Sequence, residues 1–221
     1  MVECQAPPDD GGSIPTPSLH FSPCRLADVS DFVKKNHYSH SYPGGIDLSF
    51  RLDFNGQLGG ACLFGYKTGN VKATFLRSCS DVSKYRELVR LVLLDEVPKN
   101  SESRFIGWCL RWLRKNTDLV GIVSFADPRE GHRGTVYRAT NWIYCGLQKP
   151  DRDRIFIDGT EIHPRSCVGR YGTSSIKRLI EMGLNVTTAK REPKHRYVQI
   201  FQGSVADLKW ETRKWDWIEE I

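Results

Sequence analysis

The spacing of apolar residues predicts alternating helices and strands over most of the chain. Leu26, Val29 and Val33 form one helical face after the helix-start signal Ser22-Pro23. The segment LSFRLDF alternates apolar and polar residues before an Asn55-Gly56 hairpin turn. The expected elements, in chain order, are a helix over 22–36, strands over 48–54 and 58–66, a strand over 86–94, a helix after the turn 98–101, a strand over 119–126, a short helix over 135–140, a strand over 142–148, a hairpin over 154–163 turned by Asp158-Gly159, a helix capped by Thr173 that stops before Gly183, and a strand over 197–201.

Two nearly continuous apolar runs, RELVRLVLL and LVGIVSFA, predict strands that are covered on both faces. The helix between them places Phe105, Cys109, Leu110 and Leu113 on one side. A strand–helix–strand crossover of this length makes a parallel pair. The pattern therefore predicts an α/β fold, and neither an internal repeat nor an internal domain boundary is visible.

The two ends of the chain differ from the middle. Residues 1–18 are rich in Pro, Gly and Asp and lack the basic and apolar regions of a signal peptide, so they are expected to be a disordered leader. Residues 19–205 are expected to be the catalytic domain. Residues 206–221 contain three tryptophans, which predicts a tail docked on the domain or on a partner subunit, as in a homodimer. No apolar run approaches the roughly 20 residues that a membrane-spanning helix needs.

Charge and cysteine content narrow the class of protein. Lys plus Arg exceed Asp plus Glu by 32 to 26, a formal net charge of +6. This excess favours an anionic partner, most commonly nucleic acid, over a merely solvated basic surface. The seven cysteines are scattered, odd in number and never spaced C-x-x-C, which is typical of reduced thiols in a cytoplasmic protein and disfavours a cysteine zinc site.

Candidate chemistry lies where the two buried strands end. Ligands of α/β sheets bind beyond the carboxyl ends of strands, where Asp127 and the turn 98–103 are expected. Asp127 could act as a base or orient an amine, or it could simply cap the next turn. Ser101 and Ser103 lie at a helix N-terminus that could bind an anion, or could be plain capping residues.

Other candidates stand out by residue type and context. His37 and Tyr38 open a loop before Pro43-Gly44-Gly45, and we predict a backbone turn between them so that both face one cleft. Arg90 lies within an apolar strand, so it must face a cavity or pair with a carboxylate such as Glu87 or Asp95. Tyr137 could face the same cleft or belong to the core.

The segments HYSHSYPGG, ELVRLVLLDEVPKNSESRFI, VSFADPREGHRGTVYRATNWIYCG and PKHRYV resemble, in wording and order, the phage Mom family. The resemblance covers roughly residues 20 to 201. It implies a GNAT-like fold, a mixed central sheet flanked by helices in a single domain. It also implies attachment of a carbamoylmethyl (glycinamide-like) group to N6 of adenine in phage DNA, which protects that DNA from restriction in the host cytoplasm.

The resemblance assigns functional positions to His37, Tyr38, Asp127 and Tyr137 as catalytic residues and to Arg90 and Ser103 near the donor, with Ser101 beside them. Ordinary GNAT enzymes hold the acyl-CoA pyrophosphate with a Gly-rich loop, and this chain has PKNSESRF there, so an acyl-CoA-type and an aminoacyl-type donor both stay open. Iron is a further cofactor suggested for the family, with His37 as the first ligand candidate. The cations expected to hold the phosphates of double-stranded DNA are Lys34, Lys35, Arg129, Arg133 and Arg138.

Two other functions are compatible with the same sequence. A GNAT acyltransferase acting on a small-molecule or protein amine would bind acyl-CoA and not DNA. A DNA-binding protein with an inactive site would bind DNA without making a product. If the DNA-modifying function is correct, the adenine must leave the base stack, and Tyr38 or Tyr137 would stack on it.

Overall fold

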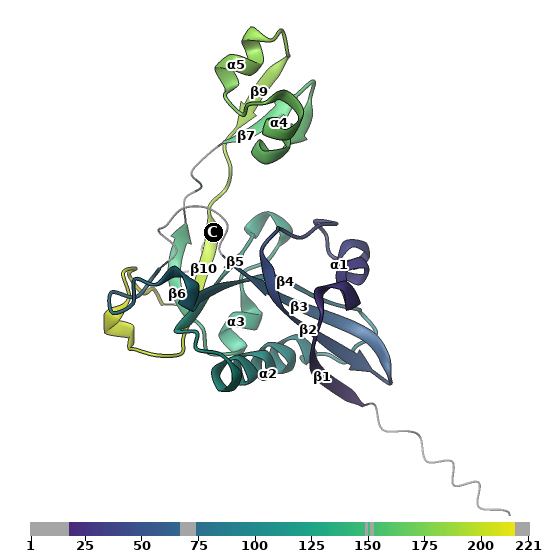
Figure 1. Cartoon of the computed structure of the whole chain (residues 1–221), viewed down its shortest axis with the longest axis vertical. Helices are drawn as coiled ribbons and strands as arrows, with labels where there is room; N and C mark the ends of the chain where they lie inside the picture. Colours follow the sequence, from purple (N-terminus) through teal and green to yellow (C-terminus); the bar gives the residue numbers. More distant parts are fainter. Residues whose placement is uncertain (1–17, 67–73, 149, 151–152, 215–221) are drawn as a thin grey trace, which may run out of the picture.

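A seven-stranded mixed sheet forms the centre of the molecule (Figure 1). The computed structural model describes residues 18–66, 74–148, 150 and 153–214. The strand order is β1-β2-β3-β4-β5-β10-β6, in which β4 and β5 run parallel and the other neighbours run antiparallel. The strands are β1 (Leu19–Cys24), β2 (Ile46–Phe54), β3 (Gln57–Gly65), β4 (Tyr85–Leu93), β5 (Gly121–Ala126), β6 (Ile143–Gln148) and β10 (Lys194–Ile200). The predicted α/β fold, with a parallel pair inside a mixed sheet, is confirmed.

Helices cover both faces of this sheet. Helix α2 (Ser101–Asn116) and the short helix α3 (Thr135–Ala139) pack on one face, and α1 (Ser30–Asn36) packs on the other. Strand β3 shows the division, because Cys62 and Phe64 belong to the core under α2 whereas Ala61 and Leu63 belong to the core under α1. Short 3₁₀ turns complete the domain: η1 (Leu26–Asp28), η2 (Val82–Lys84), η3 (Pro128–Glu130) and η4 (Val205–Asp207).

Residues 153–193 form a small unit of their own, here called the insert lobe. It contains β7 (Arg154–Ile157), β8 (Thr160–Ile162), β9 (Val186–Ala189), α4 (Pro164–Tyr171) and α5 (Ile176–Glu181), with sheet order β8-β7-β9. Ile155, Ile157, Cys167 and Leu179 are its buried centre. The lobe is inserted between β6 and β10 and projects away from the main sheet (Figure 1).

Two predicted helix starts were wrong. Ser22 and Pro23 lie in β1, which pairs with β2 along its whole length, and the helix begins only at Ser30. Proline is compatible with β1 because this strand is at the sheet edge and has one neighbour. Helix α5 begins after Ser175 rather than Thr173, whose hydroxyl accepts a hydrogen bond from the Ser175 N–H at 3.1 Å. Strand β9 and helix α4 were not predicted.

The described part of the C-terminal tail docks on its own domain. Trp210 stacks on Phe75 with ring centroids 5.5 Å apart, and the Arg196 guanidinium lies 3.8 Å from the Trp210 ring centroid. Arg213 N–H donates to the Tyr144 carbonyl at 2.9 Å. Trp215, Trp217 and the leader up to residue 17 lie outside the described residues. Among the described helices, none combines the length and the apolar character needed to cross a membrane.

Candidate active site

A large opening in the described structure lies where β4 and β5 separate. The two strands pair only from Tyr85 to Leu88 with Gly121 to Ser124. The β3–β4 register shifts between Leu88 and Arg90, so Val89 is an extra residue that bends β4 at the same place. Beyond this point a cavity of about 750 Å³ opens at the carboxyl ends of both strands. Its walls are residues 36–38, 88–93, Asn100, Glu102, Ser103, 125–126 and 130–137, with Ala139.

His37 lies in the cavity wall directly after α1. The His40 N–H donates to the His37 carbonyl at 2.9 Å, which closes the turn predicted at His37–Tyr38. The ring is buried, and its Nδ1 accepts the Ser39 backbone N–H at 3.1 Å. Burial, followed by the nearby positive charge of Arg90, lowers the pKa of His37 to about 4. His37 is therefore neutral at pH 7, and the bonded Nδ1 leaves its proton on Nε2.

Tyr38 presents an exposed ring at the cavity mouth. Its ring centroid lies 4.2 Å from that of His37 and 5.9 Å from that of His132. About half of the residue, 49%, is exposed. Burial of the other half and the negative charge of Asp127 raise the pKa of the phenol, so Tyr38 is neutral and offers an aromatic face.

Arg90 turns into the cavity, but not toward the predicted carboxylate. Its Nε donates to the Ser41 carbonyl at 2.8 Å, and its NH1 donates to the Val89 carbonyl at 2.6 Å. Among the described residues, Glu87 acts on Arg90 through its charge and makes no ion pair with it. Of the two predicted alternatives, Arg90 faces a cavity and does not pair with a carboxylate, because the β4 bulge and the 39–41 turn supply carbonyl oxygens instead.

Tyr137 closes the apex of the cavity. Its hydroxyl lies 2.7 Å from Ser124 Oγ, and Ser124 donates in turn to the Leu88 carbonyl at 3.0 Å. Leu88 and Ser124 are the last paired residues of β4 and β5. The ring packs against Trp142 and Tyr197, and burial raises the pKa of the phenol far above its usual value. Tyr137 is thus both a cavity residue and a core residue.

Asp127 ends β5 beside the cavity but is not part of its wall. Its carboxylate accepts the Arg129 N–H at 3.1 Å, which caps η3, and forms an ion pair with Lys194 at 2.8 Å. Burial opposes ionisation, but the hydrogen bond and charge of Lys194 outweigh it and the pKa of Asp127 is lowered. An ion-paired carboxylate with a lowered pKa is a weak base, so the capping alternative describes this residue better.

The two predicted serines in the first turn of α2 face different surroundings. Ser103 lines the cavity and donates to the Asn100 carbonyl at 3.0 Å. Ser101 is fully buried on the same side as Phe105 and lies outside the cavity wall. Glu102 lines the cavity at this turn, so the helix N-terminus carries a carboxylate where an ordinary GNAT enzyme holds a pyrophosphate.

The side chains do not fit the suggested iron. In the described part of the chain, no group of three or more His, Cys, Asp and Glu side chains is arranged to hold a metal ion. Nδ1 of His37 already accepts a hydrogen bond, which leaves a single ring nitrogen for any ligand. We therefore derive no step through a metal.

The cations predicted to contact DNA are exposed. Arg133 lines the cavity, and Arg129 lies in the same loop between β5 and α3. Lys34 and Lys35 occupy the last turn of α1, directly before His37, and Arg138 lies on α3. Sequence reasoning missed His132 and Lys194, although the glycines around His132-Arg133 did mark a loop of unusual conformation, with φ of +71° at Gly131 and +84° at Gly134.

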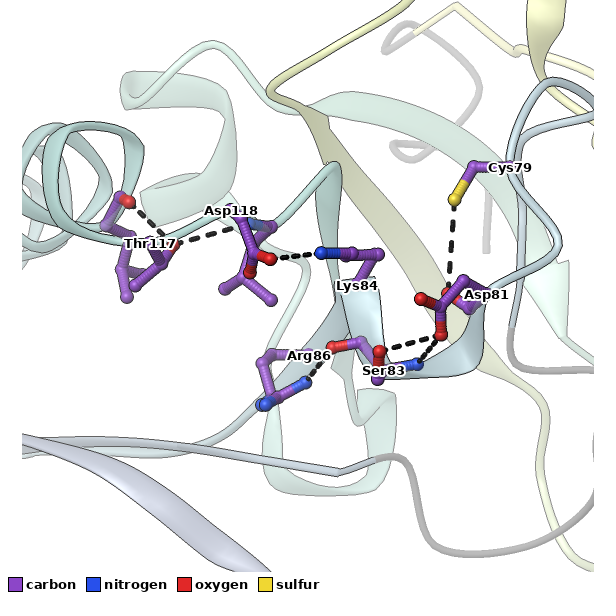
Figure 2. Close-up of polar contacts among 9 residues, drawn as sticks. Cys79, Asp81, Ser83, Lys84, Arg86, Thr117 and Asp118 are labelled. Atoms are coloured by element: carbon purple, nitrogen blue, oxygen red, sulfur yellow. Dashed lines mark hydrogen bonds and ion pairs between the residues drawn. The ribbon is translucent and has the colours of Figure 1, made fainter.

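A second cavity, of about 490 Å³, lies near the opposite ends of β4 and β5. Figure 2 shows the polar groups at the start of β4: Lys84 pairs with Asp118, Arg86 donates to the Ser83 carbonyl, and Asp81 accepts from Ser83. Arg86 also pairs with Asp47 at 2.7 Å. These groups satisfy one another and so join β4 to its neighbours, which leaves the larger cavity as the candidate active site.

The model of the Mom protein family matches residues 18–216, which is most of the chain and includes every wall of the larger cavity. The chain belongs to the Mom protein family. A curated relative, the methylcarbamoylase mom of Escherichia phage Mu, is 33% identical to this Mom-family chain over 124 residues. The match covers 56% of this chain and 51% of the relative, so it spans about half of the length of that protein.

Solved structures with a comparable fold are acetyltransferases. The aminoglycoside acetyltransferase AAC(6')-Ib, in complex with ribostamycin and coenzyme A, gives a TM-score of 0.48 at 10% identity, over 83% of this chain and 93% of that one. An acetyltransferase from Acinetobacter baylyi gives 0.49 at 9% identity, over 84% and 93%. At this level of similarity we infer no donor and no acceptor from them.

Proposed function

We propose that this Mom-family protein modifies double-stranded DNA by attaching a carbamoylmethyl group to N6 of adenine. One observation carries the proposal: three separate segments of the chain bring His37 with Tyr38, Arg90 and Tyr137 to one cavity. All four residues lie within the part of the chain that matches the Mom family, and the curated relative is named a methylcarbamoylase. The cavity opens at the strand ends, where α/β enzymes bind their substrates.

The cavity suits an adenine that has left the duplex. N6 takes part in base pairing, so chemistry on it requires extrusion of the base. A volume of about 750 Å³ accommodates a purine together with a small donor group. The exposed Tyr38 ring offers a stacking face at the entrance, supported from behind by His37.

His37 and Arg90 act as donors of hydrogen bonds rather than as bases. A neutral imidazole with its proton on Nε2 can donate to a carbonyl oxygen without carrying a charge of its own. Arg90 holds the Ser41 carbonyl through Nε and the Val89 carbonyl through NH1, and it places a positive charge beside them. Together they would polarise and orient the amide-like group that is transferred.

His132 is the residue to which we assign proton removal. When N6 forms its new bond to the methylene carbon of the donor, the bond from that carbon to the leaving group breaks and N6 loses a proton. His37 and Asp127 are poor acceptors of that proton at pH 7. His132 is an exposed residue at the cavity mouth, and its ring centroid lies 5.9 Å from that of Tyr38. Its backbone N–H donates to the Asp127 carbonyl at 3.1 Å, which fixes this part of the loop. Imidazole is the side chain best suited to proton transfer near neutral pH.

The donor is less constrained than the acceptor. Glu102 at the start of α2 disfavours a diphosphate at that helix, and therefore a CoA donor held as in ordinary GNAT enzymes. An aminoacyl-type donor has no diphosphate to place there.

The proposal is tested by mass spectrometry of nucleosides from the DNA of an expressing host. Wild-type protein should yield an adenine nucleoside with the mass of an added carbamoylmethyl group. Arg90→Lys should lose most of that product, because a point charge cannot hold two carbonyls in one plane. Equal thermal unfolding temperatures of the two proteins would show that the fold is retained.

Three outcomes would contradict the proposal in different ways. Acyl-CoA binding without DNA binding would favour an acyltransferase acting on another amine. DNA binding without a modified nucleoside would indicate an inactive site. Wild-type product levels in Arg90→Lys would remove Arg90 from the mechanism.

A further inference from the structure

We propose that the insert lobe is a second DNA-binding surface, which grips the duplex beside the cavity through α4 and α5. The inference rests on the proposed function and names the part of the protein that would hold the DNA outside the reacting base. The lobe has its own core and its own sheet, so it does not serve to complete the main domain. The stability of the main domain therefore does not explain the presence of the lobe.

The lobe is rooted at the end of the sheet where the cavity opens. Strand β10 runs antiparallel to β5, and its first residue, Lys194, forms the ion pair with Asp127 at the β5 carboxyl end. The pKa of Glu161 on β8 is lowered mainly by its hydrogen bond to Arg154, with smaller contributions from the charges of Arg129, in the cavity loop, and Arg191, in the lobe. Because the Lys194–Asp127 pair joins the base of the lobe to the β5 end, a duplex over the cavity would lie beside the lobe.

The two lobe helices carry mostly positive charge. Between residues 164 and 182 the sequence has Arg165, Arg170, Lys177 and Arg178 against the single acid Glu181. Arg170, Lys177 and Arg178 are exposed. Lys177 lies 4.0 Å from Glu181 in an exposed pair, which is weak enough for a phosphate to displace. This balance suits the phosphate backbone of DNA.

The same helices also expose apolar side chains. Ile176 and Ile180, one turn apart on α5, are 39% and 54% exposed, and Met182 and Val168 are at least as open as Ile176. A second copy of the chain could cover such residues. The surrounding cations would then face the same cations of the partner, so the charge favours DNA, and the apolar residues would contact sugars in a groove.

The test compares two charge-matched double variants of the full-length chain. Lys177→Gln/Arg178→Gln removes two cations from the lobe, and Arg111→Gln/Lys115→Gln removes two exposed cations from α2. The lobe variant should bind a 20-base-pair duplex about tenfold more weakly at moderate salt. Its slope of log affinity against log salt concentration should be smaller by about two, because two phosphate contacts are lost. The α2 variant should bind like the wild type. The lobe variant should also raise KM for duplex DNA while kcat stays unchanged.

The outcomes separate this inference from the proposed function. If the wild type does not bind the duplex, the proposed function fails together with the inference. If the wild type binds and both variants bind equally well, the lobe proposal is overturned and the proposed function stands. If the lobe variant changes the sedimentation of the free protein but not its DNA affinity, the surface belongs to a second copy and the proposal is again overturned.

Discussion

Single residues in the cavity owe their chemistry to their surroundings. An isolated histidine titrates near pH 6.5, whereas His37 is buried, accepts a backbone N–H and has a pKa of about 4. The carboxylate of Asp127 is a group that could act as a base, but its contacts are those of a structural cap. Residue type alone does not distinguish the proposed roles of His37 and His132.

The lowered pKa of His37 has a consequence for stability against pH. In the unfolded chain His37 takes up a proton near pH 6.5, and in the folded protein only near pH 4. The unfolded state therefore binds more protons between these values, and the free energy of unfolding falls as the pH drops from 6.5 toward 4. His195, whose pKa is also lowered by burial, acts in the same direction.

We expect His37→Gln to remove part of this acid sensitivity. Between pH 7 and pH 5 the free energy of unfolding of the wild type should fall by on the order of 1 kcal/mol more than that of the variant. This difference is smaller than the full pKa shift implies, because the ring borders an open cavity. Urea unfolding of both proteins at the two pH values measures the difference. Equal losses would show that His37 titrates normally in the folded protein.

Among the secondary-structure elements, the parallel pair and the loop after it create the site. Strands β4 and β5 are held together up to the Leu88–Ser124 pair, and the Tyr137 hydroxyl completes this junction. The loop from β5 to α3 then carries His132 and Arg133 to the cavity. Tyr197 fixes the end of this loop, because its hydroxyl donates to the Arg133 carbonyl at 2.5 Å.

Two glycines of this loop make a matched pair for testing that anchor. Both have positive φ, but a Cβ on Gly134 would lie 2.5 Å from the Tyr197 ring, whereas a Cβ on Gly131 would meet nothing within 4 Å. Gly131→Ala should lower the free energy of unfolding by about 1 kcal/mol, because alanine is strained in the left-handed backbone conformation. Gly134→Ala should cost about 2 kcal/mol more, because the Tyr197 ring must move. Equal losses in chemical denaturation would show that the anchor is not rigid.

Across the whole molecule, the distribution of charge matters more than its sum. A net charge of +6 is modest for 221 residues. However, Arg133 lines the cavity and Arg129 lies in the same loop. Lys34 and Lys35 end the helix before the cavity, and the insert lobe adds further cations at the same end of the sheet. DNA binding by this surface should depend on local phosphate contacts.

We expect duplex affinity to fall steeply with salt. If about four to six phosphates are contacted, the logarithm of the association constant should fall by about four to five for each tenfold rise in salt concentration. Fluorescence anisotropy with a labelled duplex between low and moderate salt measures this slope. An affinity independent of salt would contradict a phosphate-based interface.

The sequence by itself predicted the parallel strand pair, the helix between them and the Asn55-Gly56 hairpin, because local periodicity and turn residues encode these features directly. It could not place Ser22-Pro23 in an edge strand, since the pairing of β1 with β2 overrides the local helix signal. Nor could it assign the ion pair of Asp127 with Lys194, the carbonyl partners of Arg90 or the buried ring of His37. These depend on groups distant in sequence or on burial, and only the tertiary structure brings those together.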